Sequence, residues 1–227
     1  MKHLPSETFT PTAIRGSATL QSVAPDDTQG DPVWHYYTAK RIFDLSMSIL
    51  LLPVFILTSL ILLVVNPSKN KGPLFYVQTR MGKNCDPFQA IKFRSMTVTN
   101  TIERGANDPL ETHRITRLGN FLRRSRLDEV PQIINVFKGE MSLVGPRPDY
   151  IEHAKVYVDT IPGYTERHAV RPGISGFAQT EVGYAEGIEA TRAKVEADLQ
   201  YIKNRTLAFE AWIVWRTLQI VIKRGGA

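Results

Sequence analysis

The sequence predicts a mixed α/β fold, in which a helix-rich α+β domain follows one membrane-associated helix. Three observations carry this prediction: an uncharged apolar run over 45–65, two short strand-like runs after it, and five segments with helical periodicity. A chain of 227 residues suits one domain with an anchor. Only one run is long and apolar enough to enter a bilayer, which excludes a polytopic transporter.

Composition narrows the class of protein further. Charged residues make up 22% and hydrophobic residues 43%, as in globular proteins. The one cysteine, Cys85, excludes an internal disulfide framework and a thiolate zinc site. The sequence has no GxxxxGK[ST] loop and no HExxH motif, and its five histidines lack ligand spacing. These absences disfavour a P-loop ATPase and a zinc protease.

The chain divides into three regions. Residues 1–35 are rich in Pro, Ser, Thr, Asp and Gly without any apolar period, so we expect a disordered tail. We expect residues 36–70 to form a membrane segment and 71–227 to form the folded domain. The net charge of the chain is +6, and the tail carries −2, so the basic character belongs to the folded part.

The apolar run has two alternative arrangements in a membrane. At ~1.5 Å per residue it measures roughly 30 Å, the thickness of a hydrocarbon core. Pro53 near its middle permits either a kinked spanning helix or a re-entrant helix that enters and leaves on one face. Basic residues flank both ends, Lys40 and Arg41 before it and Lys69 and Lys71 after it. Such flanks prefer the cytoplasmic side, which a straight spanning helix cannot give to both ends, but the charges alone leave both arrangements open.

The remaining elements follow from local patterns. Strands are predicted over 74–77 and 88–93, and helices over 116–124, 131–138, 151–158, 188–204 and 208–223. Residues 145–148 and 171–173 are rigid loops rich in Gly and Pro. The last helix carries Trp212 and Trp215 and has basic ends. It suits either a membrane interface or the domain core, and both alternatives stay open.

Arginines are unusually dense before residue 127. Five lie within thirteen residues, namely Arg114, Arg117, Arg123, Arg124 and Arg126, and the surrounding strands and loops add Lys92, Arg94, Arg147 and Arg171. Each alone suits a solvated basic face, but together they predict a site for a polyanion, because the guanidinium fork matches phosphate. Anionic lipid and a sugar nucleotide both fit, whereas nucleic acid is disfavoured because no nucleic-acid-binding module is present.

The carboxylate pair Asp128 and Glu129 follows these arginines directly. Adjacent acids are common at helix N-termini, and this simpler explanation applies here too. Beside a cluster of cations the pair also suits phosphoryl chemistry. An aspartate can attack phosphorus as a nucleophile, and a carboxylate can hold Mg²⁺ together with substrate phosphates. The loop over 145–148 would present Arg147 with little conformational freedom to lose.

Several ordered motifs over 38–224 resemble those of the bacterial sugar transferases. In chain order they are Lys40-Arg41-x-Phe43-Asp44, Gly72-Pro73-x-Phe75-x-x-Gln78-x-Arg80-x-Gly82, Phe88-x-x-x-Lys92-Phe93-Arg94-Ser95-Met96, Arg114-Ile115-Thr116-Arg117-Leu118-Gly119-x-Phe121-Leu122-Arg123-Arg124, Leu127-Asp128-Glu129-x-Pro131-Gln132, Val144-Gly145-Pro146-Arg147-Pro148 and Arg171-Pro172-Gly173. One departure stands beside the acid pair, where many members have Ser and this chain has Arg126.

The resemblance implies a monotopic phosphoglycosyl transferase. Such an enzyme moves a sugar-1-phosphate from a UDP-sugar to undecaprenyl phosphate, releases UMP, and starts the assembly of an exopolysaccharide, capsule, O-antigen or glycoprotein glycan. The implied nucleophile is Asp128, and the implied Mg²⁺ ligand is Glu129. The cations expected to bind substrate phosphate are Lys92, Arg94, Arg117, Arg124, Arg147 and Arg171. The family fold also has a re-entrant membrane helix, broken here at Pro53, and interfacial amphipathic helices.

The resemblance also implies a location and partners. We expect the chain on the bacterial inner membrane, with its catalytic domain on the cytoplasmic face, in contact with lipid and with downstream glycosyltransferases. A homo-oligomer is a further open alternative, and the sugar stays undetermined. Two other functions remain to be weighed: an adaptor that docks on anionic lipid without needing the acid pair, and a membrane phosphohydrolase that releases inorganic phosphate.

Overall fold

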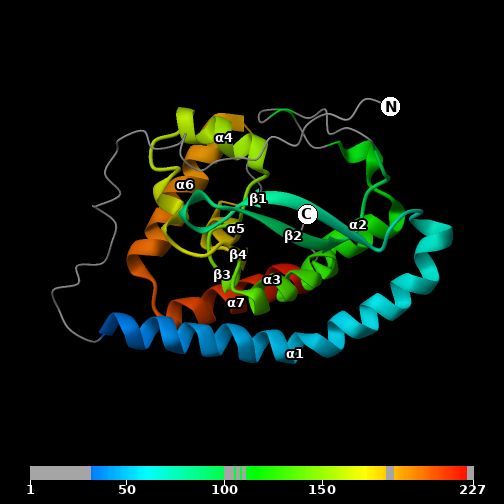
Figure 1. Ribbon diagram of the computed structural model, residues 1–227, viewed down its shortest axis with the longest axis horizontal. Coiled ribbons are helices and arrows are strands. Elements are labelled where there is room, and N and C mark those ends of the chain that lie inside the picture. Colours follow the sequence, from blue (N-terminus) through cyan, green and yellow to red (C-terminus); the bar gives the residue numbers. More distant parts are fainter. Residues whose placement is uncertain (1–31, 100–104, 106–107, 109–110, 183–186, 224–227) are drawn as a thin grey trace.

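A computed structural model describes residues 32–99, 105, 108, 111–182 and 187–223 of the chain. The first helix, α1 (Pro32–Lys69), runs along one side of a body that contains all the other elements (Figure 1). It begins at Pro32, within the region for which a tail is predicted; residues 1–31 of that region lie outside the described part. The helix is long and apolar enough to cross a membrane.

The body is helix-rich and has two small sheets, so the predicted α+β class is confirmed. The helices are α2 (Arg117–Arg124), α3 (Ile133–Lys138), α4 (Ile151–Thr160), α5 (Phe177–Glu181), α6 (Gly187–Asn204) and α7 (Leu207–Ile222). The strands are β1 (Phe75–Met81), β2 (Pro87–Phe93), β3 (Ser142–Val144) and β4 (Gly173–Ser175). The described residues also form the short 3₁₀ helices η3 (Lys83–Cys85), η4 (Thr112–Arg114), η5 (Leu127–Gln132) and η6 (Glu166–Ala169).

The two sheets differ in kind. Strands β1 and β2, both predicted from the sequence, form an antiparallel hairpin with Tyr76 opposite Lys92 and Phe75 opposite Phe93, and β1 extends beyond the predicted 74–77 to Met81. Strands β3 and β4 form a parallel pair that the sequence does not predict. Strand β3 lies just before the predicted loop over 145–148, and β4 begins at the end of the predicted loop over 171–173. Each has three residues, which is too short for a period-2 pattern to be visible in the sequence. This parallel pair joins two loops that are distant in the chain.

Helix α1 is bent, and both of its halves pack on the same body (Figure 1). Pro53 lies inside it without ending it. In the first half Phe43, Met47 and Leu51 contact the core cluster around Ile213, and in the second half Leu62 packs against Phe93. The opposite face is lined with exposed leucine, isoleucine and valine side chains. A bent apolar helix attached along its length to a polar domain is the geometry expected at a membrane surface.

Both ends of α1 are tied to the body by hydrogen bonds. Near its start, Arg41 Nη1 donates to the carbonyl of Val136 at 2.7 Å. Just after its end, Asn70 Nδ2 donates to the carbonyl of Arg94 at 2.7 Å. Both ends of the helix are therefore held by one body.

The C-terminal helix α7 has one face that suits the domain core and another that suits a membrane interface, the two alternatives considered for it. Its inner face carries Glu210 and Ile213, which are fully buried against α1, β3 and α6. Its outer face leaves Trp215 60% exposed, together with Leu218 and Ile222. The helix is therefore amphipathic, with one face in the core and an apolar face that has no protein cover among the described residues.

Candidate active site

The acid pair lies in η5, where three elements meet. Helix α2 begins with Thr116, whose side chain accepts a hydrogen bond from the N–H of Gly119. A Cβ at Gly119 would lie 1.7 Å from the carbonyl oxygen of Ser95, so only glycine lets α2 pack against the chain that follows β2. After α2, Arg126 adopts a left-handed conformation that turns the chain into η5. This turn directs Asp128 and Glu129 into the body.

Both carboxylates are buried, and Glu129 is surrounded by cations. The exposed fractions of Asp128 and Glu129 are 6% and 4%. Lys92 Nζ of β2 lies 2.6 Å from Glu129 Oε1. Arg147 donates with Nη1 to Oε2 at 3.0 Å and with Nη2 to Oε1, and Arg126 Nη1 lies 3.5 Å from Oε2. Three cations from separate parts of the chain thus meet at one carboxylate.

The two acids have opposite electrostatics. Burial by itself would raise the pKa of Glu129, but Arg147 and Lys92 lower that pKa well below its usual range. Burial, reinforced by the negative charge of Glu129, raises the pKa of Asp128 to about 6. Burial also lowers the pKa of Lys92 to about 8, against the opposing effect of Glu129. At neutral pH the site therefore holds a stabilised Glu129 anion beside a more basic carboxylate.

Asp128 is the less satisfied of the two acids. Its Oδ1 is buried and has no hydrogen-bond partner within the part of the chain that the structure describes. A buried oxygen without a donor retains its lone pairs, and an elevated pKa makes the carboxylate a better nucleophile. These properties fit Asp128 for attack on an electrophile placed among the cations.

The segment that carries Arg147 is held from several sides. Arg167 Nη2 donates to the backbone carbonyl of Arg147 at 2.7 Å, and Arg80 Nη1 donates to that of Pro148 at 2.6 Å. A Cβ on Gly173 would lie 2.1 Å from the backbone nitrogen of Gly145, so the two predicted loops are in direct backbone contact. These contacts fix the direction from which the Arg147 guanidinium reaches Glu129.

Arg167 belongs to a buried ion network that the sequence does not predict. Its side chain is fully buried and lies 2.6 Å from Asp149 Oδ2 and 2.7 Å from Asp198 Oδ2. Lys194 Nζ lies 2.6 Å from Asp149 Oδ1. The partners stand 18 or more positions apart in the chain, so no local spacing signals them. The one available signal was Asp149 itself, which follows the Gly-Pro-Arg-Pro segment directly.

The other predicted phosphate ligands lie away from Glu129. Arg94 Nε donates to the carbonyl of Pro73, and Arg171 Nε donates to that of Gly139, both at 2.8 Å. Arg117 and Arg124 are exposed on α2. None of these four arginines forms an ion pair with Asp128 or Glu129 among the described residues. Of the six predicted cations, the structure brings Lys92 and Arg147 to the pair, and it adds Arg126.

The comparisons with known proteins decide the family. The family model described as bacterial sugar transferase matches residues 35–224. The chain belongs to the bacterial sugar transferase family.

Curated relatives of this bacterial sugar transferase chain carry related names. It is 39% identical over 85% of its length to the UDP-N-acetylgalactosamine-undecaprenyl-phosphate N-acetylgalactosaminephosphotransferase of Aeromonas hydrophila. It is 40% identical over 73% of its length to the UDP-glucose:undecaprenyl-phosphate glucose-1-phosphate transferase of Escherichia coli K12. These matches cover 45% and 37% of the relatives, so the chain spans less than half of their length. The exopolysaccharide production protein PSS of Rhizobium leguminosarum is 36% identical, over 82% of this chain and 96% of that protein.

The acid pair of this sugar transferase chain would provide a magnesium ion with only part of its ligands. The described residues contain no group of three or more His, Cys, Asp and Glu side chains that could ligate a metal alone. A carboxylate accepts about four hydrogen bonds, and Lys92 and Arg147 provide three to Glu129. One acceptor position remains on its Oε2. Mg²⁺ usually takes one or two carboxylates and completes its octahedron with water and substrate phosphates, so this donor set suits it.

Proposed function

We propose that the chain transfers a sugar-1-phosphate from a UDP-sugar to undecaprenyl phosphate and releases UMP. The observation that carries the proposal is the buried carboxylate of Asp128, whose Oδ1 has no hydrogen-bond partner among the described residues, beside a Glu129 held by three cations. The names of the relatives, which act on UDP-sugars and undecaprenyl phosphate, support the same reaction class. A docking adaptor would not need a nucleophile buried in this way.

The proposed reaction has two displacements at one phosphorus. In the first, a carboxylate oxygen of Asp128 attacks the phosphorus that bears the sugar, and the bond from that phosphorus to the bridging oxygen breaks. UMP leaves with the electron pair of that bond. In the second, a phosphate oxygen of undecaprenyl phosphate attacks the same phosphorus and displaces the Asp128 carboxylate. The product is a lipid diphosphate sugar, and Asp128 is restored as an anion.

The cations of the site stabilise the negative charge that this reaction moves. Arg147 has a planar guanidinium that can turn from Glu129 to a phosphate oxygen, and Lys92 and Arg126 add charge on two other sides. Glu129 orders these cations before substrate binds, and through Oε2 it would hold Mg²⁺. Mg²⁺, when bound, would neutralise charge on the diphosphate.

We further infer that α1 is a re-entrant membrane helix. Its outer apolar face, bounded by two ends hydrogen-bonded to one body, supports an anchor that enters and leaves on the same side. The exposed tryptophans of α7 support a body that rests on the interface. With the basic flanks of α1, this arrangement favours the cytoplasmic face of the bacterial inner membrane.

The test is nucleotide release from the detergent-solubilised full chain with magnesium, undecaprenyl phosphate and a panel of UDP-sugars. We expect UMP with one donor, which also identifies the sugar. Asp128→Asn should reduce the rate by at least about 10³-fold because it removes the nucleophile. Asp159→Asn is a matched control, since Asp159 is an exposed aspartate on α4, and it should retain the wild-type rate.

Three outcomes would contradict the proposal. Release of UDP would mean direct glycosyl transfer, in which the sugar moves without its phosphate. Release of inorganic phosphate would indicate a phosphohydrolase. Wild-type turnover by Asp128→Asn would remove Asp128 from the chemistry. Membrane lipid, a homo-oligomer and downstream glycosyltransferases remain proposed partners, and the glycan pathway follows from the sugar that the assay identifies.

A further inference from the structure

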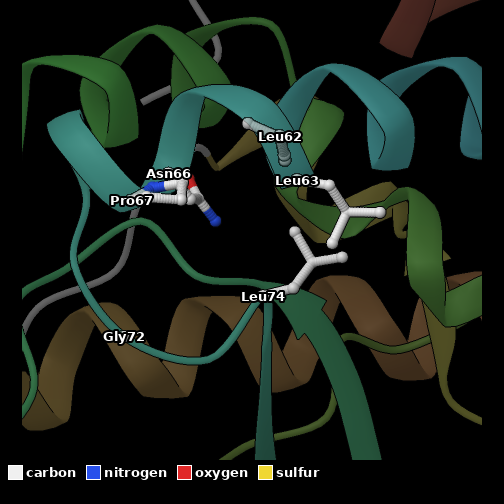
Figure 2. A pocket seen from close by; sticks show the side chains of 6 residues that line it. All are labelled: Leu62, Leu63, Asn66, Pro67, Gly72 and Leu74. Atoms are coloured by element: carbon white, nitrogen blue, oxygen red, sulfur yellow. The ribbon is translucent and has the colours of Figure 1, made fainter.

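A small cavity lies at the C-terminal end of α1, away from the acid pair. Its volume is about 270 Å³, and Figure 2 shows it between the last turns of α1 and the start of β1. It is lined by Leu62, Leu63, Asn66, Pro67, Gly72 and Leu74. A cavity of about 150 Å³ lined by apolar side chains is enough to bind benzene, so this space suits a branched hydrocarbon group. Leu63 is largely exposed on the outer face of α1, so the cavity opens toward that apolar surface.

One polar side chain points into this apolar cavity. Asn66 is 4% exposed, and neither Nδ2 nor Oδ1 has a hydrogen-bond partner among the described residues. Figure 2 shows its amide nitrogen directed from the helix into the space bounded by Leu63, Leu74 and the turn at Gly72. Leaving a buried amide unpaired destabilises the folded state, because the lost hydrogen bonds to water are not replaced. The amide is therefore suited to a ligand that brings a hydrogen-bond acceptor into the cavity.

The Arg94 side chain passes beside one lining residue of the cavity, and its Nε donates to the carbonyl of Pro73. A Cβ built on Gly72 would be 3.4 Å from Arg94 Nε, so the Arg94 side chain passes directly beside this lining residue. Asn70 Nδ2, one helical turn after Asn66, donates to the Arg94 carbonyl at 2.7 Å. Lys69 and Lys71 add exposed positive charge to the same turn. An apolar cavity with an unpaired amide and an adjacent cation matches a hydrocarbon chain that ends in an anion.

Two cations, Arg94 and Lys92, lie between this cavity and the acid pair. The N–H of Arg94 donates to the carbonyl of Leu74 at 3.0 Å, so the β-ladder continues to this residue. Lys92 and Arg94 then share one face of the hairpin, roughly 7 Å apart along the strand. The Arg94 guanidinium lies 6.0 Å from the ring centre of Tyr76, which pairs with Lys92. Lys92 in turn contacts Glu129.

We propose that the polyprenyl phosphate acceptor first binds in this cavity with its phosphate end, before the phosphate moves past Arg94 and Lys92 to the acid pair; this inference rests on the proposed function. The first isoprene units would fill the space between the leucines, and the amide of Asn66 would donate to a phosphate oxygen. Arg94 would provide the positive charge. The chain would leave past Leu63 toward the apolar face of α1. This assignment explains why Arg94 lies away from Glu129: it serves the phosphate of the acceptor, and Lys92 and Arg147 serve the diphosphate of the donor.

Two variants of the full chain test the proposal. Asn66→Leu keeps the size of the side chain and removes the amide, and Leu63→Trp fills the cavity from an exposed position. The matched control Leu60→Trp adds the same bulk at another exposed position of α1 that does not line the cavity. We expect Asn66→Leu and Leu63→Trp to raise the KM for undecaprenyl phosphate about tenfold, without an equal change in the KM for the UDP-sugar. Equal increases in both constants, or none, would overturn the proposal.

A binding measurement separates this proposal from the proposed function. A ligand that binds the folded state raises the unfolding temperature, so thermal unfolding in detergent reports acceptor binding without turnover. Undecaprenyl phosphate should stabilise the wild type and Leu60→Trp but not Asn66→Leu or Leu63→Trp. Undecaprenol, which lacks the phosphate, and phosphatidylglycerol should stabilise the wild type much less. Stabilisation of all four proteins by undecaprenyl phosphate, or equal stabilisation of the wild type by phosphatidylglycerol, would overturn the assignment. Selective binding without UMP release would uphold the cavity and contradict the proposed reaction.

Discussion

Asp128 and Glu129 are adjacent in the chain and equally buried, yet the cations reach only one of them directly. Glu129 accepts hydrogen bonds from Lys92 and Arg147, whereas Asp128 Oδ1 has no partner in the described part of the chain. The pKa of Glu129 is therefore low and the pKa of Asp128 is high. In the proposed reaction, this division would let Glu129 organise the cations and leave Asp128 to react.

The raised pKa of Asp128 predicts a stability cost. In the folded state its pKa is about 6, above the ordinary value, so the folded protein holds this proton more tightly than the unfolded chain does. The stabilisation of the folded state by protonated Asp128 is complete at low pH. It is lost as the pH rises through about 4 to 6. A shift of about two units corresponds to roughly 3 kcal/mol at neutral pH.

Asp128→Asn should therefore unfold at a higher temperature than the wild type at pH 7.5 in EDTA, with a smaller difference at pH 5. Thermal unfolding at the two pH values measures this effect. Asp159→Asn, which changes an exposed aspartate, should unfold like the wild type at both. An Asp128→Asn protein that is less stable than the wild type at pH 7.5 would refute the electrostatic argument.

Arg147 provides a second prediction for a single residue. Its guanidinium contacts both oxygens of Glu129, a geometry that lysine cannot reproduce. Arg147→Lys should lower kcat/KM for UMP release by about 10²-fold, because a preorganised bidentate cation is lost where charge develops. Arg192→Lys, at an exposed site of α6, is the control. Equal activity of the two variants would exclude a role for the guanidinium geometry.

Among the elements, the parallel pair of β3 and β4 does most to assemble the site. It brings the loop of Gly145 and Arg147 against the loop that begins at Arg171, with backbones in contact at Gly173. The side chain of Arg147 can then reach Glu129 from a fixed support. Two strands of three residues each thus determine where the Arg147 guanidinium lies.

Gly173→Ala tests this support. The added methyl group would lie 2.1 Å from the backbone nitrogen of Gly145, so the two loops must separate. We expect kcat for UMP release to fall and the unfolding temperature to drop by several degrees. Gly187→Ala is a useful comparison because Gly187 has a positive φ but no atom of the described residues within 4 Å of the added Cβ, so only the roughly 1 kcal/mol of backbone strain applies. If both variants had the same kcat, the loop contact would not position Arg147.

The elements also show what the sequence could predict. The hairpin and the longer helices have enough residues for a period to be visible, and they are confirmed, with α4 extending to Thr160. The three residues of β3 carry no such signal. The role of Arg167 depends on Asp149 and Asp198, which are near it only after folding. Of the predicted cations, Lys92 and Arg147 meet the acid pair because β2 and the loop after β3 converge there, and sequence spacing does not encode that convergence.

At the scale of the whole molecule, the arrangement of α1 on the body determines how the enzyme would meet its lipid substrate. The body covers one face of the helix, the outer face is apolar, and the acid pair lies in the body beside the second half of the helix. A water-soluble donor and a lipid acceptor could then reach the same site from opposite sides.

This arrangement predicts the topology of α1 in cells. In a Cys85→Ser background, single cysteines would replace Thr38 and Lys71, exposed residues at the two ends of α1. A membrane-impermeant maleimide should label both cysteines in inverted inner-membrane vesicles and neither in intact spheroplasts. Labelling of one cysteine from each side would establish a spanning helix and contradict re-entrance.

The most direct measurement of the central claim is the mass of the protein after incubation with its UDP-sugar and magnesium, without any acceptor. The account predicts one equivalent of UMP per protein and a mass increase equal to one phosphosugar. Peptide mapping should place that group on Asp128, and undecaprenyl phosphate should then remove it. If no UMP and no adduct form without acceptor, while turnover is complete with it, transfer is direct and the covalent role of Asp128 is contradicted.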